Sequence, residues 1–270
     1  MLITTWNVNS LRIRLPQLES WARANPVDVI ALQETKITDE DFPVDACRAF
    51  GMQEVLYSGQ RSYNGVALLS VDTAHDVVKG LPNFPDEHKR LIAATISGVR
   101  IVNVYVPNGQ AVGSDKFTYK LAWLAALKEF LQGELERHPE LVVLGDFNIA
   151  PRDNDVHDPK AWEGSVHVSE PERAALGQIL SLGLTDIFRK FEQPEKSYSW
   201  WDYRMLAWRR NHGLRIDLVL TSPAMTERCD ACKIDKEPRG SERPSDHVPV
   251  TASFRTDAVE IVETRHSARY

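Results

Sequence analysis

Polar side chains that carry oxygen or nitrogen donors follow, interrupt or precede apolar runs at many points in this sequence. They are Asn7, Asn9, Glu34, Asn108, Asp146, Asn148, Asp217, Asp246 and His247. Asn and Asp also favour turns, so any one of these positions has an ordinary structural interpretation. Side chains at the ends of neighbouring strands converge in space, however, and we therefore expect the set as a whole to form a site.

The donor types in this set indicate the chemistry. They are carboxylate and amide oxygens with one imidazole and no thiolate, a combination that suits Mg²⁺ or Mn²⁺ and fits zinc poorly. Mg²⁺ is often held by one or two carboxylates together with phosphate oxygens of a substrate. The predicted reaction is metal-assisted attack of water on a phosphoryl group, in which a base activates the water.

A second feature is an aromatic and basic segment over residues 200–215. Its aromatic and arginine residues are Trp200, Trp201, Tyr203, Trp208, Arg204, Arg209, Arg210 and Arg215, and Asp202 is its one acidic residue. Such interleaving is typical of a surface that follows a phosphate backbone and fills a gap in a stack of bases. The alternative is a surface loop that its Trp residues anchor in the core.

Strands and helices alternate along the chain and position these residues. Apolar, β-branched runs bounded by turn residues predict strands at Leu2–Trp6, Val27–Leu32, Val66–Ser70, Leu91–Ile96, Arg100–Val106, Leu141–Gly145, Arg215–Leu220 and Val248–Phe254. Helical periodicity predicts one helix from about Pro16, a second over Asp115–Arg137, and a third that opens with a Ser169 and Glu172 capping box and stops at Gly183.

This pattern predicts an α/β fold, a four-layer sandwich in which two mixed β-sheets pack face to face with helices on the outside. We expect residues 1–256 to form a single domain and the polar residues 257–270 to form a loose tail. There is no internal repeat, and the N-terminus does not resemble a signal peptide. No apolar stretch approaches the ~20 residues that cross a bilayer, so we expect a cytoplasmic protein without a membrane partner.

Composition limits the function further. The 270 residues carry a net charge of −6, which argues against a non-specific nucleic-acid coat protein but not against a nucleic-acid enzyme. Of three cysteines, Cys229 and Cys232 form a lone CxxC. A structural zinc site needs four ligands and no second pair stands at suitable spacing, so we expect two small residues near a strand edge.

The motifs that contain these residues resemble the exonuclease III family of DNA-repair nucleases, within the larger endonuclease/exonuclease/phosphatase fold. They are TTWNVNSLR near the N-terminus, LQETK at 32–36, NGVALLS at 64–70, NVYVPNG at 103–109, LGDFNIAP at 144–151, SWWDYR at 199–204, GLRIDLVL at 213–220 and RPSDHVPV at 243–250. A single piece such as GDFN is weak evidence, but all eight occur in order up to about Phe254.

The resemblance implies roles residue by residue. Glu34 becomes the principal carboxylate for Mg²⁺, for which Mn²⁺ can substitute, with help from Asn7 and Asp246. Asp146 orients or deprotonates the attacking water, and Asn148 binds the scissile phosphate. The sequence leaves open whether Asp146 or His247 takes the proton, and a second metal site is an alternative, with ligands Asp146, Asn148 and His247.

The remaining catalytic roles also follow from the resemblance. His247, paired with Asp217, contacts a phosphate oxygen, and Tyr105 and Asn108 line the phosphate site. A carboxylate partner raises the pKa of a His and fixes its tautomer, which agrees with this pairing.

DNA contacts are expected from two regions. Arg204, Arg209 and Arg210 are predicted to bind the backbone, and the resemblance makes Trp200, Leu214 and Ile216 the walls of an apolar pocket for a base-free deoxyribose. Such a pocket selects a missing base, because an intact nucleotide would need costly flipping and more room.

His167 departs from the family pattern, in which the aligned position is small, Gly or Ser. If its ring faces the site, it crowds the path of a strand that continues past the lesion but not that of a strand that ends there. The alternative is a ring that points to solvent or caps the following helix. The sequence therefore favours processing of 3′ ends by phosphatase, phosphodiesterase or exonuclease activity.

The expected substrate is double-stranded DNA with abasic sites, nicks or 3′ ends, and the expected assembly is a monomer. A general abasic-site endonuclease with 3′→5′ exonuclease activity is the first alternative. A more distant one is a phosphodiesterase for inositol phosphates or sphingomyelin on the same fold, against which the aromatic and basic segment argues. A catalytically dead DNA-binding scaffold is a third, and the intact set of acidic, amide and His residues argues against it.

Overall fold

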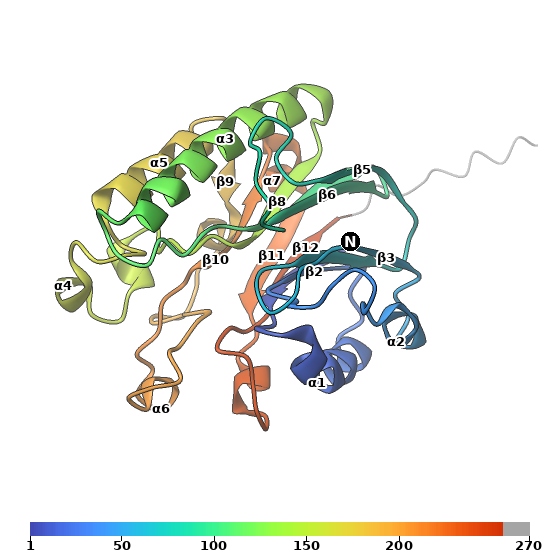
Figure 1. Cartoon of the computed structure of the whole chain (residues 1–270), viewed down its shortest axis with the longest axis horizontal. Coiled ribbons are helices and arrows are strands. Elements are labelled where there is room, and N and C mark those ends of the chain that lie inside the picture. The colour runs from blue at the N-terminus through green and yellow to red at the C-terminus, as the bar shows by residue number, and fades with distance from the viewer. Residues whose placement is uncertain (256–270) are drawn as a thin grey trace, which may run out of the picture.

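Two six-stranded sheets form the centre of the computed structural model, which describes residues 1–255 (Figure 1). In order across the first sheet, the strands are β11 (Cys229–Ile234), β12 (Val250–Phe254), β1 (Leu2–Asn7), β2 (Val29–Gln33), β4 (Val66–Ser70) and β3 (Glu54–Ser58). Across the second sheet they are β5 (Ala74–Lys79), β6 (Leu91–Ile96), β7 (Val99–Tyr105), β8 (Leu141–Asp146), β10 (Asp217–Thr221) and β9 (Thr185–Asp186). The pairs β1–β2 and β7–β8 are parallel and the other pairs are antiparallel, so both sheets are mixed.

Helices cover the outer face of each sheet (Figure 1). On the first sheet they are α1 (Leu11–Ala24) and α2 (Val44–Ala49), and on the second they are α3 (Asp115–Arg137) and α5 (Glu170–Leu180). Short helices occupy the connections: α4 (Pro159–Trp162), α6 (Ala207–Arg210), α7 (Pro223–Arg228), and the 3₁₀ turns η1 (Asp153–Asp155), η2 (Ile187–Lys190) and η3 (Glu237–Gly240).

Three apolar clusters hold the layers together. Ile3 and Val29 of the first sheet share a buried cluster with Ile101 and Val142 of the second, so the sheets pack face to face. Two further clusters fill the space between each sheet and its helices. The predicted four-layer sandwich of two mixed sheets with helices outside is therefore confirmed.

Most predicted elements exist, with shifts of one or two residues at their ends. The first helix is a clear exception, since it begins at Leu11 and contains Pro16, whereas we expected it to begin near Pro16. Four strands were not predicted, namely β3, β5, β9 and β11. Cys229 and Cys232 lie on β11, at the edge of the first sheet, as expected. The predicted domain end at 256 and the loose tail of 257–270 lie outside the described residues.

A buried polar bridge joins the two sheets close to the strand ends. The side chain of Asn103 on β7 donates to the carbonyls of Leu32, at 2.9 Å, and Ala67, at 2.8 Å. Its Oδ1 accepts from Nε2 of Gln33 on β2 at 2.7 Å, and both side chains are 0% exposed. Because Gln33 directly precedes Glu34, the bridge sets how the two sheets meet beside the acidic residues.

Replacing Asn103 with Ala should destabilise the fold by about 3 kcal/mol, since an unsatisfied buried polar group costs about 1–3 kcal/mol and the substitution leaves several. Urea denaturation of the full chain measures this. Asn83, which is exposed, offers a matched control, and Asn83→Ala should change the free energy of unfolding by less than about 0.5 kcal/mol. If both variants unfolded at the same urea concentration, the bridge would contribute nothing to stability.

Among residues 1–255, no helix combines the length and the apolar character that crossing a membrane requires.

Candidate active site

The ends of five strands from both sheets meet at one edge of the sandwich. Asn7 is the last residue of β1, Glu34 follows β2, and Tyr105 and Asp146 end β7 and β8. Strand register places Asp146 opposite Tyr105 on one side and Asp217 on the other. The expected convergence of side chains at strand ends is what the structure contains.

Asn7 connects the two carboxylates at the centre of this edge. Its Nδ2 donates to Oε1 of Glu34 at 2.8 Å and to Oδ2 of Asp146 at 2.9 Å. Asp146 is 1% exposed, whereas Glu34 lies partly open to solvent. Lys36 forms an ion pair with Oε2 of Glu34 at 2.8 Å. One face of the site therefore has a solvent-accessible carboxylate with a cation beside it.

A tight turn after β8 presents Asn148 next to Asp146. The backbone N–H of Asn148 donates to Oδ1 of Asp146 at 2.9 Å, and its Nδ2 lies 3.2 Å from Oδ2. Gly145, the last residue of β8 before Asp146, must be glycine, since its φ is +147° and an added Cβ would lie 1.9 Å from the carbonyl oxygen of Val104 on β7. Asn148 itself adopts a left-handed φ of 51°. The GDFN sequence thus holds the carboxylate of Asp146 in contact with the side-chain amide of Asn148.

His247 lies between two buried carboxylates. Its Nδ1 is 2.9 Å and 3.1 Å from the two oxygens of Asp217, and its Nε2 is 3.7 Å from Oδ2 of Asp146. Burial alone would lower the pKa of His247, but the charges of Asp217 and Asp146 outweigh it and raise the pKa to about 10. His247 is therefore an imidazolium at neutral pH, with Nδ1–H donated to Asp217 and Nε2–H directed toward the centre of the site.

The pKa values of Asp146 and Tyr105 are also shifted from their ordinary values. Burial raises the pKa of Asp146 to about 7, with Asp217 and Glu34 adding to the shift and His247 opposing it. Burial, followed by the charges of Glu34 and Asp146, raises the pKa of Tyr105 well above its ordinary value. The pKa of Asp146 thus lies near neutral pH, which suits a general base, and Tyr105 keeps its proton and can donate a hydrogen bond.

Three residues offer ligand atoms that could hold a metal ion. Glu34, Asp146 and His247 each place one such atom within 4.8 Å of the others. Glu34 was predicted as a ligand of the first metal site. Asp146 and His247 were predicted as ligands of the alternative second site. Two carboxylates that converge in a buried setting repel each other, and a hard divalent cation would relieve this repulsion. The donor set therefore fits Mg²⁺ or Mn²⁺.

Asp246 lies beside this group rather than within it. One of its oxygens accepts from Nδ2 of Asn9 at 2.9 Å and the other from Nε1 of Trp200 at 3.0 Å. Asn9 in turn accepts from Nζ of Lys36. A chain of two hydrogen bonds and one ion pair, through Asn9 and Lys36, therefore links Asp246 to Glu34.

His167 faces the site rather than solvent. It is 7% exposed, its Nδ1 lies 2.7 Å from the carbonyl oxygen of Asn148, and its Nε2 lies 3.4 Å from Nδ2 of Asn108. Burial, together with the charge of Lys120, lowers the pKa of His167 to about 4. The ring is therefore neutral, with Nδ1–H donated to Asn148 and Nε2 accepting from Asn108. Asn108 also donates to Oδ1 of Asn148 at 3.3 Å.

The expected apolar pocket is present as a cluster but not as open space. Leu214 and Ile216 pack together with Trp200, as the resemblance implied, yet they are only 0% and 1% exposed. Trp162 packs against the same cluster, and the ring of His167 lies 6.3 Å from the rings of both Trp162 and Trp200. Neighbouring side chains cover Leu214 and Ile216, and their role as walls of a sugar pocket stays a prediction.

The aromatic and basic segment of residues 200–215 divides into two kinds of residue. Trp201 is fully buried, and Arg215 is 1% exposed in ion pairs with Asp155 and Asp186. Neither can contact DNA, so part of this segment is structural. Arg204 is exposed and pairs with Asp202.

Arg209 and Arg210 are exposed on α6, which projects from the same end of the molecule as α4 (Figure 1). They are available to a phosphate backbone there.

Sequence reasoning missed three charged residues of the site: Lys36, Lys120 and Glu172. Lys36 stood in the LQETK motif without a role, and Glu172 was read only as part of a helix cap. Lys120 carried a usable signal, because it falls at helical spacing between Phe117 and Leu124 on the apolar face of α3. A Lys on such a face predicts a buried charge that needs a partner.

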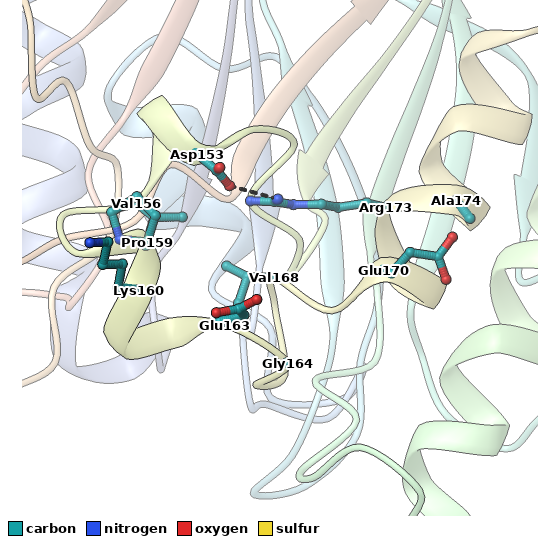
Figure 2. Close-up of a pocket in the computed structure, with 10 residues that line it drawn as sticks. All are labelled: Asp153, Val156, Pro159, Lys160, Glu163, Gly164, Val168, Glu170, Arg173 and Ala174. Carbon is teal, nitrogen blue, oxygen red and sulfur yellow. Dashed lines mark hydrogen bonds and ion pairs between the residues drawn. The ribbon is translucent and has the colours of Figure 1, made fainter.

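A cavity of about 630 Å³ lies beside the segment that carries His167 (Figure 2). Val156 and Val168 line it and also belong to the cluster with Leu214 and Ile216. The ion pair between Asp153 and Arg173 crosses one side. Neither Glu34, Asp146 nor Asp217 is among the residues that line the cavity.

Comparisons with known proteins agree with this geometry. The model of the Endonuclease/Exonuclease/phosphatase family matches residues 4–247. Exodeoxyribonuclease III of Haemophilus influenzae is 34% identical over 268 residues, covering 94% of this chain and all of that protein.

Solved structures are similar over almost the whole chain. The 3′ phosphatase NExo from Neisseria, bound to a product DNA hairpin, has a TM-score of 0.93 at 49% identity and covers 95% of this chain and all of its own. An AP endonuclease from Archaeoglobus fulgidus has a TM-score of 0.91 at 39% identity with the same coverage.

Proposed function

Because this chain belongs to the endonuclease/exonuclease/phosphatase family, and within it to the exonuclease III-like nucleases that hydrolyse phosphodiesters, we propose that it is a Mg²⁺-dependent DNA-repair enzyme specialised for 3′ ends. It removes 3′-phosphates and blocked 3′ termini and cleaves internal abasic sites poorly. We further propose that it acts as a monomer in the cytoplasm on duplex DNA with nicks, abasic sites or 3′ ends.

The donor set supports the metal dependence. Glu34 with Asn7 would hold the ion, and the carboxylate of Asp146 lies close enough to share it. When bound, Mg²⁺ neutralises the phosphate and the leaving oxygen. Asp246 accepts a hydrogen bond from Asn9 and in this way helps to hold Lys36 and Glu34 in position.

The protein's own groups supply the remaining chemistry. Asp146 accepts the proton of the attacking water, for which a pKa near neutrality is suited. Asn148, Asn108 and the phenol of Tyr105 bind the phosphate oxygens. The imidazolium of His247, held by Asp217, directs Nε2–H at the charge that develops on the phosphate.

One observation carries the preference for 3′ ends, namely the buried ring of His167 against Asn108 and Asn148. A DNA strand that continues past an abasic sugar would have to occupy the space of this ring. A strand that ends at the scissile phosphate would not. The 49% identical relative from Neisseria is described as a 3′ phosphatase.

Two labelled duplexes test the proposal, one with a 3′-phosphate at a nick and one with an internal abasic analogue. We expect the enzyme to remove the 3′-phosphate at least about tenfold faster, a difference of about 1.4 kcal/mol in barrier height. Both activities should vanish with a chelator and return with Mg²⁺ or Mn²⁺.

Equal rates on the two duplexes would replace the proposal with a general abasic-site endonuclease that also has 3′→5′ exonuclease activity. Faster hydrolysis of inositol phosphates than of DNA would remove the assignment to DNA repair altogether.

A further inference from the structure

A fully buried ion pair lies directly beneath the residues that surround His167. Lys120 on α3 and Glu172 on α5 are each 0% exposed and bind each other. The ammonium group of Lys120 also donates to the carbonyl of Asn148 at 2.7 Å and to that of Asn108 at 3.1 Å. All three of its protons are therefore used, two of them on backbone next to the phosphate site.

Glu172 holds the other side of the same region. Its Oε1 accepts from the backbone N–H of His167 at 3.0 Å, and its Oε2 accepts from the N–H and hydroxyl of Ser169. His167 adopts a left-handed φ of 78°, which is unfavourable for a residue with a Cβ. The pair thus links the strained backbone of His167 to the turn that carries Asn148.

Apolar packing does not by itself explain where this segment lies. Pro159, Lys160, Glu163, Gly164 and Val168 face the cavity of about 630 Å³ rather than a filled core (Figure 2). Besides its ring contacts with Trp162 and Trp200, His167 is held by polar contacts to Glu172, Asn108 and Asn148. Lys120 binds the backbone carbonyls of Asn108 and Asn148 and the carboxylate of Glu172, so the ion pair touches every one of these polar partners.

We propose that Lys120 and Glu172 form a positioning pair that sets substrate choice by holding the His167 ring in the path of a continuous DNA strand. This inference rests on the proposed preference for 3′ ends. Neither residue lies among the groups that could hold the metal, so their effect reaches the substrate through His167 and Asn148. Burying such a pair contributes little net stability compared with apolar residues of similar size, whereas it fixes geometry.

The double variant Lys120→Met/Glu172→Gln tests the proposal, because it removes both charges and keeps similar volumes. The quantity measured is a ratio of two initial rates, both determined with the same enzyme preparation. It is the rate of cleavage at an internal abasic site divided by the rate of 3′-phosphate removal. This ratio does not depend on the fraction of enzyme that is folded. We expect it to rise about tenfold or more, since a shift of ~1 Å can change a rate by up to about 100-fold.

The same double variant in a His167→Gly background should leave the ratio within about twofold of His167→Gly alone, since the ring that the pair holds is already gone. The matched control is the buried pair of Arg100 and Glu134, which also involves α3 but lies away from the site. Arg100→Met/Glu134→Gln should lower stability and leave the ratio unchanged. Glu172→Gln alone leaves the buried Lys120 charge without its partner and should shift the ratio in the same direction.

A proportional fall of both rates in the Lys120 and Glu172 variants would overturn the proposal, because the pair would then be structural only. An equal further rise in the His167→Gly background would also overturn it, since the effect would not pass through His167. If His167→Gly itself left the ratio unchanged, the failure would lie in the proposed preference for 3′ ends.

Discussion

Asp146→Asn should slow hydrolysis of every DNA substrate by about 10² to 10⁴-fold, the range that a positioned proton acceptor contributes. Asp146 is a buried carboxylate that places an oxygen within 4.8 Å of ligand atoms of both Glu34 and His247, and its pKa of about 7 allows it to take a proton from water at neutral pH. An amide of the same shape cannot accept that proton. Single-turnover rates on the nicked 3′-phosphate duplex measure the loss.

The same substitution should leave the fold and DNA affinity nearly intact. Burial raises the pKa of Asp146, so its charged form opposes folding at neutral pH, and removing the charge should not lower the free energy of unfolding. Fluorescence anisotropy with a labelled duplex and urea denaturation measure these two properties. Asp41→Asn, at an exposed ion pair with Arg12, is the matched control and should change none of the three. Turnover within a few-fold of the parent would remove Asp146 from the mechanism.

The sequence predicted the central strands well and the edge strands poorly, for a physical reason. β2, β4 and β8 lie inside their sheets and are wholly buried, so each consists largely of a continuous apolar run. β5 is an edge strand with mostly exposed residues, AHDVVK, and carries no such signal. The predicted start of α1 was wrong because proline is common in the first turn of a helix, whereas Pro16 lies inside α1, which begins at Leu11.

The acidic centre of the site was predictable because it depends on strand ends alone. Asn7, Glu34 and Asp146 stand where apolar runs stop, and the two parallel pairs, β1–β2 and β7–β8, bring those ends to one edge. Asp217 stands where the apolar run of β10 begins, and the antiparallel pairing of β10 with β8 brings it to the same edge. What could not be predicted depends on side-chain packing between distant segments. The packing of Trp162 against the cluster that contains Leu214 and the burial of Arg215 against Asp155 are of this kind, since residues far apart in the chain meet there.

His167→Gly should raise cleavage at internal abasic sites by about tenfold or more while 3′-phosphate removal stays within about threefold of the parent rate. The ring lies against Asn108 and Asn148 and 6.3 Å from the ring of Trp200, so its loss opens space directly beside the phosphate site and the apolar cluster. Glycine also accepts the left-handed φ of 78° without strain, which limits damage to the fold. Initial rates on the two duplexes, measured with one enzyme preparation, give both values.

Two substitutions at the same position separate the size of the ring from its chemistry. His167→Ser removes the bulk and should raise abasic cleavage as His167→Gly does, although its left-handed backbone costs stability. His167→Gln keeps much of the bulk and an acceptor for Asn108, and it should keep the parent preference. Because burial and Lys120 hold the ring neutral, the loss of a positive charge cannot explain a difference between these variants. Efficient abasic cleavage by the parent, or equal rates in all three variants, would make His167 irrelevant to substrate choice.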